Sequence, residues 1–246
     1  MNRKILKELT DALAEKGSEE RAQFMPQFLQ AYEGGYGEGD SFLGVSVPDA
    51  RKIAKRYQDL SLPDLAELLL SKWHECRLTA VFILVDQFQR ASKPRSKNRP
   101  ENSAEEIKSF YLKNLEGVNN WDLVDSSAHK ILGEWLVIHV KERKILKRLA
   151  KSKVLWKQRV AVIATLPLIR LSQFEEILDL AEFLLHHPHD LMHKAVGWML
   201  RELGKRDIEV LRAFLSEYAE TMPRTTLRYA IEKMPTAERK KWLSRK

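Results

Sequence analysis

The chain has 246 residues, and its 42 Lys and Arg against 34 Asp and Glu give a formal net charge of +8. With 44% hydrophobic and 31% charged residues, it is too apolar for a disordered basic tail and too polar for a membrane protein. The longest uninterrupted apolar stretch, Ala80–Val85, is far shorter than the roughly 20 residues of a membrane-spanning helix. The N-terminus carries no apolar signal segment. We therefore expect a soluble, cytoplasmic, globular protein with no membrane partner.

The sequence predicts α-helices from its first residues onward. Apolar residues recur at spacings of three and four, as in Ile5, Leu9 and Leu13, and breaks rich in Gly, Ser and Pro separate about a dozen such segments. The alternating β-branched runs of an all-β chain are missing. Five of the ten glycines lie in the loop Gly34–Gly44. We expect Met1–Gly44 to form an N-terminal helical cap region that ends in this loop.

Three helices, whose basic residues are Arg77, Arg159 and Lys194, share one pattern. In each, a polar residue precedes the base, and a small or aliphatic stretch follows it. The bases are 82 and 35 residues apart, and the first separation is roughly twice a HEAT-type period of about 40–47 residues. The pattern favours one all-α domain over residues 1–246. We expect a right-handed α-α superhelix, a solenoid of HEAT-like repeats, whose concave face is basic and binds DNA.

Positive charge is concentrated in three segments. Lys141–Arg159 holds nine bases and one acid, so 9 − 1 gives +8, as much as the whole chain. Arg90–Arg99 and Arg239–Lys246 each add five bases and no acid. Such clusters are typical of proteins that bind a polyanion, with nucleic acid as the first candidate. A solvated helix face or flexible loop is the alternative for any one run, and we expect Arg90–Pro100 to be a basic inter-helix loop.

The most informative stretch for chemistry begins at Asn119. Either Asn119 or Asn120 suits a helix N-cap, and Asp122 in the first turn suits the helix dipole. Asp125 lies four residues after Trp121, so both side chains project from one face of the helix. A carboxylate beside an indole is a poor core pair. Either the two form a functional pair, or Asp125 pairs with a neighbouring base.

Tryptophan and arginine recur together on two later helices. Trp156 comes shortly before Arg159, and Trp198 shortly before Arg201. The guanidinium fork matches phosphate, and an aromatic face attracts cations and stacks on sugars or bases. A large core residue is the alternative for Trp198. Gly197 beside it indicates that something approaches the helix closely, because glycine inside a helix costs about 1 kcal/mol.

Two further features favour structural roles. Cys76, the only cysteine, sits in an apolar helix pattern and is expected to be buried. The histidine cluster is expected to form an inter-helix turn, since no HExxH motif and no thiolate accompanies it. We therefore expect no metal and no cofactor. The cluster consists of His186, His187, His189 and His193.

Several motifs together resemble the DNA alkylation repair family of HEAT-like-repeat glycosylases, the AlkD type. The resemblance extends from about Arg21 to Trp242, and its motifs are Tyr36–Val45, Val47–Lys52, Asn120–Trp135, Trp156–Ala161 and Lys194–Glu202. It implies a monofunctional glycosylase that hydrolyses the N-glycosidic bond of cationic N3- or N7-alkylated purines in duplex DNA. It also implies a reaction on a base that stays stacked. We expect a monomer, associated with the nucleoid if the source is bacterial.

The resemblance also assigns residues. Trp121, Asp125 and Trp198 match the catalytic cleft of the family, and Arg159 matches an arginine that binds the DNA backbone near the lesion. As the base leaves in neutral form, a fixed carboxylate such as Asp125 can stabilise the charge that develops on the deoxyribose. The residues expected to bind DNA are Arg159, Phe28, Lys157, Lys194 and Arg201.

The sequence departs from the family at three places. Phe28 stands where the AlkD type carries a tyrosine, Asn120 stands where some members have another tryptophan, and the loop Arg90–Arg99 is longer than in compact members. Phe28 keeps the aromatic face. Two alternatives to the enzyme stay open: a non-catalytic HEAT-like module that binds unusual DNA or RNA structures, and a protein-binding scaffold with an acidic partner.

Overall fold

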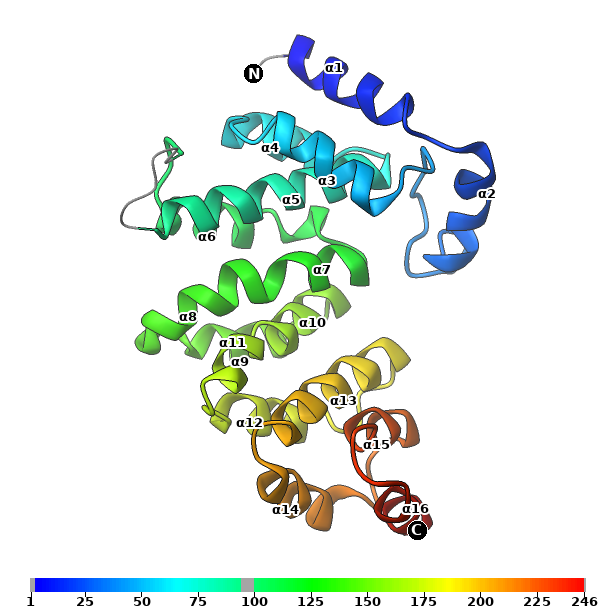
Figure 1. The fold of residues 1–246 in the computed structure, drawn as a ribbon, viewed down its shortest axis with the longest axis vertical. Coiled ribbons are helices and arrows are strands. Elements are labelled where there is room, and N and C mark those ends of the chain that lie inside the picture. Colours follow the sequence, from blue (N-terminus) through cyan, green and yellow to red (C-terminus); the bar gives the residue numbers. More distant parts are fainter. Residues whose placement is uncertain (1–2, 94–99, 246) are drawn as a thin grey trace. The chain divides into compact units, whose positions relative to one another are not determined.

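The computed structural model describes residues 3–93 and 100–245, and the chain divides into two compact units, Met1–Ser127 and Ala128–Lys246. Within these residues helices make up the regular secondary structure, and the only β contact is an isolated bridge between Ser41 and Trp73 (Figure 1). The predicted all-α fold is confirmed. No helix in the described part of the chain is long and apolar enough to cross a membrane. The predicted basic loop Arg90–Pro100 begins too early, since Arg90 and Ala91 belong to the end of the helix His74–Ala91, and residues 94–99 lie outside the described residues.

The first unit is organised around one long helix, α5. It is buried on nearly all sides, and α3, α4 and α6 pack against it. Serine side chains cap several of the surrounding helices, including Ser46 before α3 and Ser61 before α4. The helices of this unit are α1 (Arg3–Ala14), α2 (Glu19–Phe28), α3 (Val47–Arg56), α4 (Leu62–Leu69), α5 (His74–Ala91), α6 (Ala104–Lys113) and α7 (Trp121–Ala128), with a 3₁₀ turn at Leu115–Gly117.

Two early residues of α5 have structural roles that suit their burial. Cys76 is buried as predicted, and burial raises the pKa of its thiol. Arg77 is buried as well, and its Nη1 donates to the carbonyl oxygen of Ser71 at 2.7 Å. The basic position in the first of the three repeated patterns therefore stabilises the turn before its own helix.

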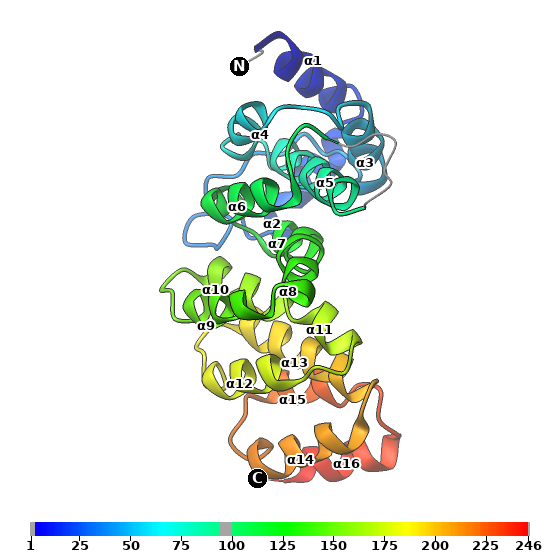
Figure 2. The ribbon, with the colours of Figure 1, turned by 90° about the vertical axis from the view of Figure 1, so that its left-hand side faces the viewer.

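The second unit stacks its helices in two layers. α10, α13 and α15 pack on one another in succession, and α9 and α12 pack beside them; Figure 2 shows α9 and α10, then α12 and α13, at successive levels. This arrangement is that of an α-helical repeat. The elements are a π-helical turn (His129–Gly133), α8 (Glu134–Ile138), a 3₁₀ turn (Val140–Glu142), α9 (Lys144–Ala150), α10 (Leu155–Ile163), α11 (Leu166–Arg170), α12 (Glu175–Phe183), α13 (Asp190–Gly204), α14 (Ile208–Tyr218), α15 (Arg224–Ala230) and α16 (Thr236–Ser244).

Gly197 lies in the contact between α13 and α15. A Cβ atom at this position would lie 2.5 Å from Cβ of Tyr229 and 2.7 Å from the carbonyl oxygen of Thr226. No real side chain fits at such distances, so the packing of α15 requires glycine here. The close approach that the sequence indicated at Gly197 is therefore made by a neighbouring helix.

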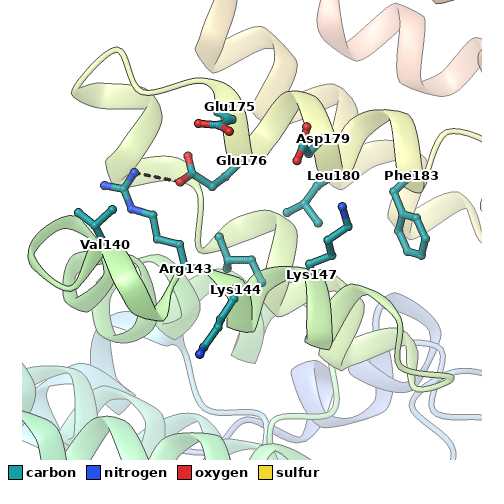
Figure 3. A pocket seen from close by; sticks show the side chains of 10 residues that line it. Val140, Arg143, Lys144, Lys147, Glu175, Glu176, Asp179, Leu180 and Phe183 are labelled. Carbon is teal, nitrogen blue, oxygen red and sulfur yellow. Dashed lines mark hydrogen bonds and ion pairs between the residues drawn. The ribbon is translucent and has the colours of Figure 1, made fainter.

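The basic run Lys141–Arg159 is divided between the two layers. The run begins just before α9 and continues along it, and its last residues lie on α10. A pocket of about 260 Å³ separates α9 from α12, with Lys144 and Lys147 on one wall and the acids of α12 on the other (Figure 3). Arg143 donates from Nη1 to Oε1 of Glu176 at 2.9 Å. Arg143 and Lys147 of the run therefore lie opposite acidic residues of the same unit.

Candidate functional site

An aromatic cluster joins α2 to the start of α7 in the first unit. The ring of Phe28 meets the half-buried Trp121 edge to face, with 5.5 Å between centroids and 77° between planes. Phe24 stacks on Phe28 at 6.0 Å. Phe24 and Phe28 are 57% and 50% exposed. Two predicted site residues, Phe28 and Trp121, thus lie together in a cluster whose aromatic surface is open to solvent.

Asn120 connects the two helices that carry this cluster. It is fully buried, and its Nδ2 donates to the carbonyl oxygen of Leu29 at 3.4 Å. Its Oδ1 accepts a hydrogen bond from the backbone of Trp121 at 2.8 Å. Leu29 directly follows Phe28 and caps α2. Asn120 therefore holds the end of α2 against the beginning of α7.

Asp122, in the first turn of α7, is bonded to a buried histidine. Its Oδ2 lies 2.8 Å from Nε2 of His74, and Nδ1 of the same ring lies 3.0 Å from Oδ2 of Asp40. Arg77 also donates to Asp40 through Nη2. Asp122 is thus part of a network among the glycine-rich loop, α5 and α7, in line with the structural role expected for it.

His74 stays protonated within this network. Burial alone would lower its pKa, but the hydrogen bonds that the ring donates to Asp122 and Asp40, together with the charge of Asp122, raise the pKa to about 9. The charge of Arg77 acts in the opposite direction. At neutral pH the ring is therefore an imidazolium between two carboxylates.

Asp125 is the second carboxylate of α7, and it has different surroundings. It is half-buried and lies one turn after Trp121. Burial raises the pKa of Tyr111 well above its usual range, and the negative charge of Asp125 adds to this effect. The Tyr111 hydroxyl lies 2.9 Å from Oγ of Ser127. The two acids of α7 therefore have different surroundings. Asp122 is hydrogen-bonded to His74, and Asp125 lies on the same face of the helix as Trp121.

The second unit holds the remaining predicted residues on two adjacent helices, α10 and α13. Arg159 on α10 is 4% exposed, and its Nη1 donates to the carbonyl oxygen of Leu191, in the first turn of α13, at 2.5 Å. Trp156 is buried and belongs to the core. Arg159 therefore fixes the start of α13, and its contact with DNA stays a prediction.

The predicted residues of α13 are half-buried. Lys194 pairs with Asp190 at 2.6 Å, and Arg201 pairs with Glu232 of the segment that follows α15. Trp198 lies on the same helix, and Lys157 is half-buried on α10. The structure thus collects Lys157, Arg159, Lys194, Trp198 and Arg201 on two helices that pack together.

Three histidines of the cluster, His186, His187 and His189, lie in the turn between α12 and α13, as the sequence predicted, and His193 lies on α13. His187 lies 2.9 Å from Oε1 of Gln158 through Nε2, and His193 lies 2.5 Å from the carbonyl oxygen of His187. The ring of His189 accepts a hydrogen bond from the backbone of Leu191. Burial lowers the pKa of both His187 and His189. Among the described residues, no group of three or more His, Cys, Asp and Glu side chains is arranged to hold a metal ion.

Two features of the first unit were missed by sequence reasoning. Phe24 lies four residues before Phe28 on α2, and this helical spacing could have linked the two rings. The pairing of His74 with Asp122 joins residues 48 positions apart, and no local pattern signals it.

Comparison with known proteins gives two matches. The sequence matches the model of a family described as DNA alkylation repair enzyme over residues 9–234. A solved structure described as a predicted DNA alkylation repair enzyme from Enterococcus faecalis is similar with a TM-score of 0.69 and 18% identity, covering 90% of this chain and 98% of that one. At this identity the likeness shows a common fold. No curated protein matches the chain.

Proposed function

The chain belongs to the DNA alkylation repair enzyme family, and on that premise we propose that it is a DNA glycosylase. The family supports a role in DNA repair and DNA as the partner. The proposed substrate is a cationic N3- or N7-alkylated purine in duplex DNA, and the proposed reaction is hydrolysis of its N-glycosidic bond.

One observation carries the proposal: Asp125 lies one helical turn after Trp121, whose ring meets Phe28 edge to face. When the bond between C1′ and the purine nitrogen breaks, its electron pair moves into the cationic ring, and the base leaves in neutral form. Positive charge develops on the deoxyribose. A carboxylate stabilises this charge and accepts the proton of the water that attacks C1′.

The aromatic faces have a related role in this proposal. The indole of Trp121 attracts the cationic base or sugar, a cation–π interaction of about 0.5–2 kcal/mol. Trp198 on α13 supplies a second such face. Lys157, Arg159, Lys194 and Arg201 bind phosphates and set the register of the duplex.

Release of free base from duplex DNA that contains N7-methylguanine tests the activity. We expect release by the wild type under single-turnover conditions. Asp125→Asn should slow release by about 10²–10³-fold without weakening duplex binding, because the transition state loses its nearest negative charge. Asp11→Asn, at an exposed residue paired with Lys7, is the matched control and should not change the rate.

Two results would count against the proposal. If the wild type binds the duplex but releases no base, a non-catalytic DNA-binding module explains the protein better. If Asp125→Asn releases base as fast as the wild type, Asp125 has no part in the chemistry.

The resemblance to the AlkD type supports attack on a base that stays stacked. With 2-aminopurine placed next to the lesion, we expect its fluorescence to change little on binding, because flipping would unstack it. A strong rise in fluorescence before base release would show that the base is flipped.

A further inference from the structure

We propose that His74 is a positioning residue of this site, which holds the first turn of α7, and with it Trp121 and Asp125, by bridging Asp122 and Asp40. The consequence for catalysis rests on the proposed function, whereas the bridge itself is a feature of the fold.

Both nitrogens of the His74 ring face carboxylate oxygens. Nε2 lies 2.8 Å from Oδ2 of Asp122, and Nδ1 lies 3.0 Å from Oδ2 of Asp40. The side chains of His74, Asp40 and Asp122 are 1%, 5% and 19% exposed. An ionised carboxylate only accepts hydrogen bonds, so the ring must donate from both nitrogens. Only the imidazolium form can do this.

The two carboxylates around His74 favour that form, and the charge of Arg77 opposes it. Asp40 faces it from the glycine-rich loop and Asp122 from α7, while Arg77 approaches from its own helix, with Nη2 3.4 Å from Nδ1. The ring of Phe42 packs against it at 5.4 Å. Arg77 also donates to Asp40, so the two bases His74 and Arg77 are hydrogen-bonded to the two acids Asp40 and Asp122 in a largely buried network. Removal of the ring proton would leave one carboxylate facing a lone pair.

The bridge lies next to the proposed site. Asp122 directly follows Trp121 and comes three residues before Asp125. On the other side, Asn120 connects the same turn to Leu29. His74 and Asn120 thus hold the first turn of α7 from two directions. Small displacements of a catalytic group greatly reduce the rate, and loss of the bridge should therefore displace Trp121 and Asp125.

The test replaces the ring by a neutral side chain, His74→Gln, and measures single-turnover release of N7-methylguanine over pH 6–10 with the uncatalysed background subtracted. We expect the rate at pH 7 to fall at least tenfold, while the affinity for the duplex stays within twofold. The rate of the wild type should decline as pH rises through about 9, where His74 loses its proton. This alkaline decline should be absent in His74→Gln. A general loss of stability would lower the rate without removing the decline.

Two further variants define the result. Asp122→Asn, at the most exposed member of the network, should move the alkaline decline to lower pH, because the hydrogen bond and the charge of Asp122 both raise the pKa of His74. This variant serves if His74→Gln does not fold. His186→Gln, at an exposed histidine of the α12–α13 turn, should retain the wild-type rate and pH profile. An unchanged rate and profile in both His74→Gln and Asp122→Asn would overturn the proposal.

A measurement that needs no catalysis separates this proposal from the proposed function. In protein labelled with 5-fluorotryptophan, the ¹⁹F signal of Trp121 is assigned through Trp121→Phe. We expect it to shift in His74→Gln, and in the wild type as pH rises through about 9. If the wild type releases no base, the proposed function fails, and the ¹⁹F signal of Trp121 alone then tests the positioning role of His74. A Trp121 signal that responds to neither change would overturn the positioning role.

Discussion

The Oε1 atom of Glu75 lies 2.8 Å from the backbone nitrogen of Gly44, 31 residues earlier in the chain. The same carboxylate accepts hydrogen bonds from the backbone of Leu43 at 3.0 Å and of Val45 at 3.2 Å. Gly44 has a φ of +74°, and a Cβ there would lie 2.1 Å from the carbonyl oxygen of Ser18. Glu75 and its neighbour His74 therefore fix one loop from the first turn of α5, and that loop carries Asp40.

Glu75→Gln should lower the free energy of unfolding by about 2–4 kcal/mol. The amide keeps one acceptor oxygen and directs an NH₂ group at backbone donors, so buried N–H groups lose their partner. Urea denaturation at pH 7 measures the effect. Glu67→Gln, on the exposed face of α4, should stay within about 0.5 kcal/mol of the wild type. Equal stability of the two variants would show that the loop does not depend on this carboxylate.

His74 should make stability depend on pH in the alkaline range. Its pKa is about 9 in the folded chain against 6.5 for the ordinary residue, so its contribution is fully present below pH 6.5 and is lost as pH rises through about 9. The difference in unfolding free energy between the wild type and His74→Gln should shrink by up to about 3 kcal/mol from pH 6 to pH 10. Urea unfolding at both values measures it. A constant difference would mean that the ring does not titrate there.

Phe28→Ala should slow base release about two- to tenfold, because an edge-to-face aromatic pair contributes about 0.5–1.5 kcal/mol. Phe28→Tyr retains the ring and should retain the rate. The control is Phe183→Ala on α12, since Phe183 is 49% exposed and Phe28 is 50% exposed. Single-turnover assays would compare the three variants. If Phe28→Ala and Phe183→Ala slow base release equally, Phe28 has no specific role in the reaction.

Two lysines from one basic run can show which layer of the second unit binds DNA. Lys157 lies on α10 and Lys147 on α9, where it faces the acids of α12 (Figure 3). Lys157→Ala should reduce the slope of log K against log salt by about 1, as for loss of one phosphate contact. Lys147→Ala should leave the slope unchanged. The reverse result would place the duplex on the α9 side.

Gly197→Ala should destabilise the protein by about 1–3 kcal/mol, although alanine is the better helix former by about 1 kcal/mol. The added methyl would meet Cβ of Tyr229 and the backbone of Thr226, neither of which can move freely. In Gly204→Ala the nearest atom, at 2.4 Å, is the terminal Cδ2 of Leu211, which can rotate away, so the cost should be smaller. Thermal unfolding of both variants tests this order.

Local patterns of the sequence were sufficient to predict the helical fold and part of the candidate site. Spacings of three and four are set by the geometry of a single helix, and they place Trp121 and Asp125 on one face of α7 without any tertiary information. The turn between α12 and α13 was also predictable, because the His187-Pro188-His189 sequence interrupts that spacing.

The tertiary structure decided the roles of the charged residues. The sequence places Asp122 in the first turn of α7, but only the packed fold brings it within 2.8 Å of Nε2 of His74, 48 residues away. Arg159 bonds the carbonyl of Leu191, 32 residues further on, and the basic run before it is divided between two layers. Helical periodicity acts over a few residues, whereas partners of buried charges come from segments that only the packed fold brings together.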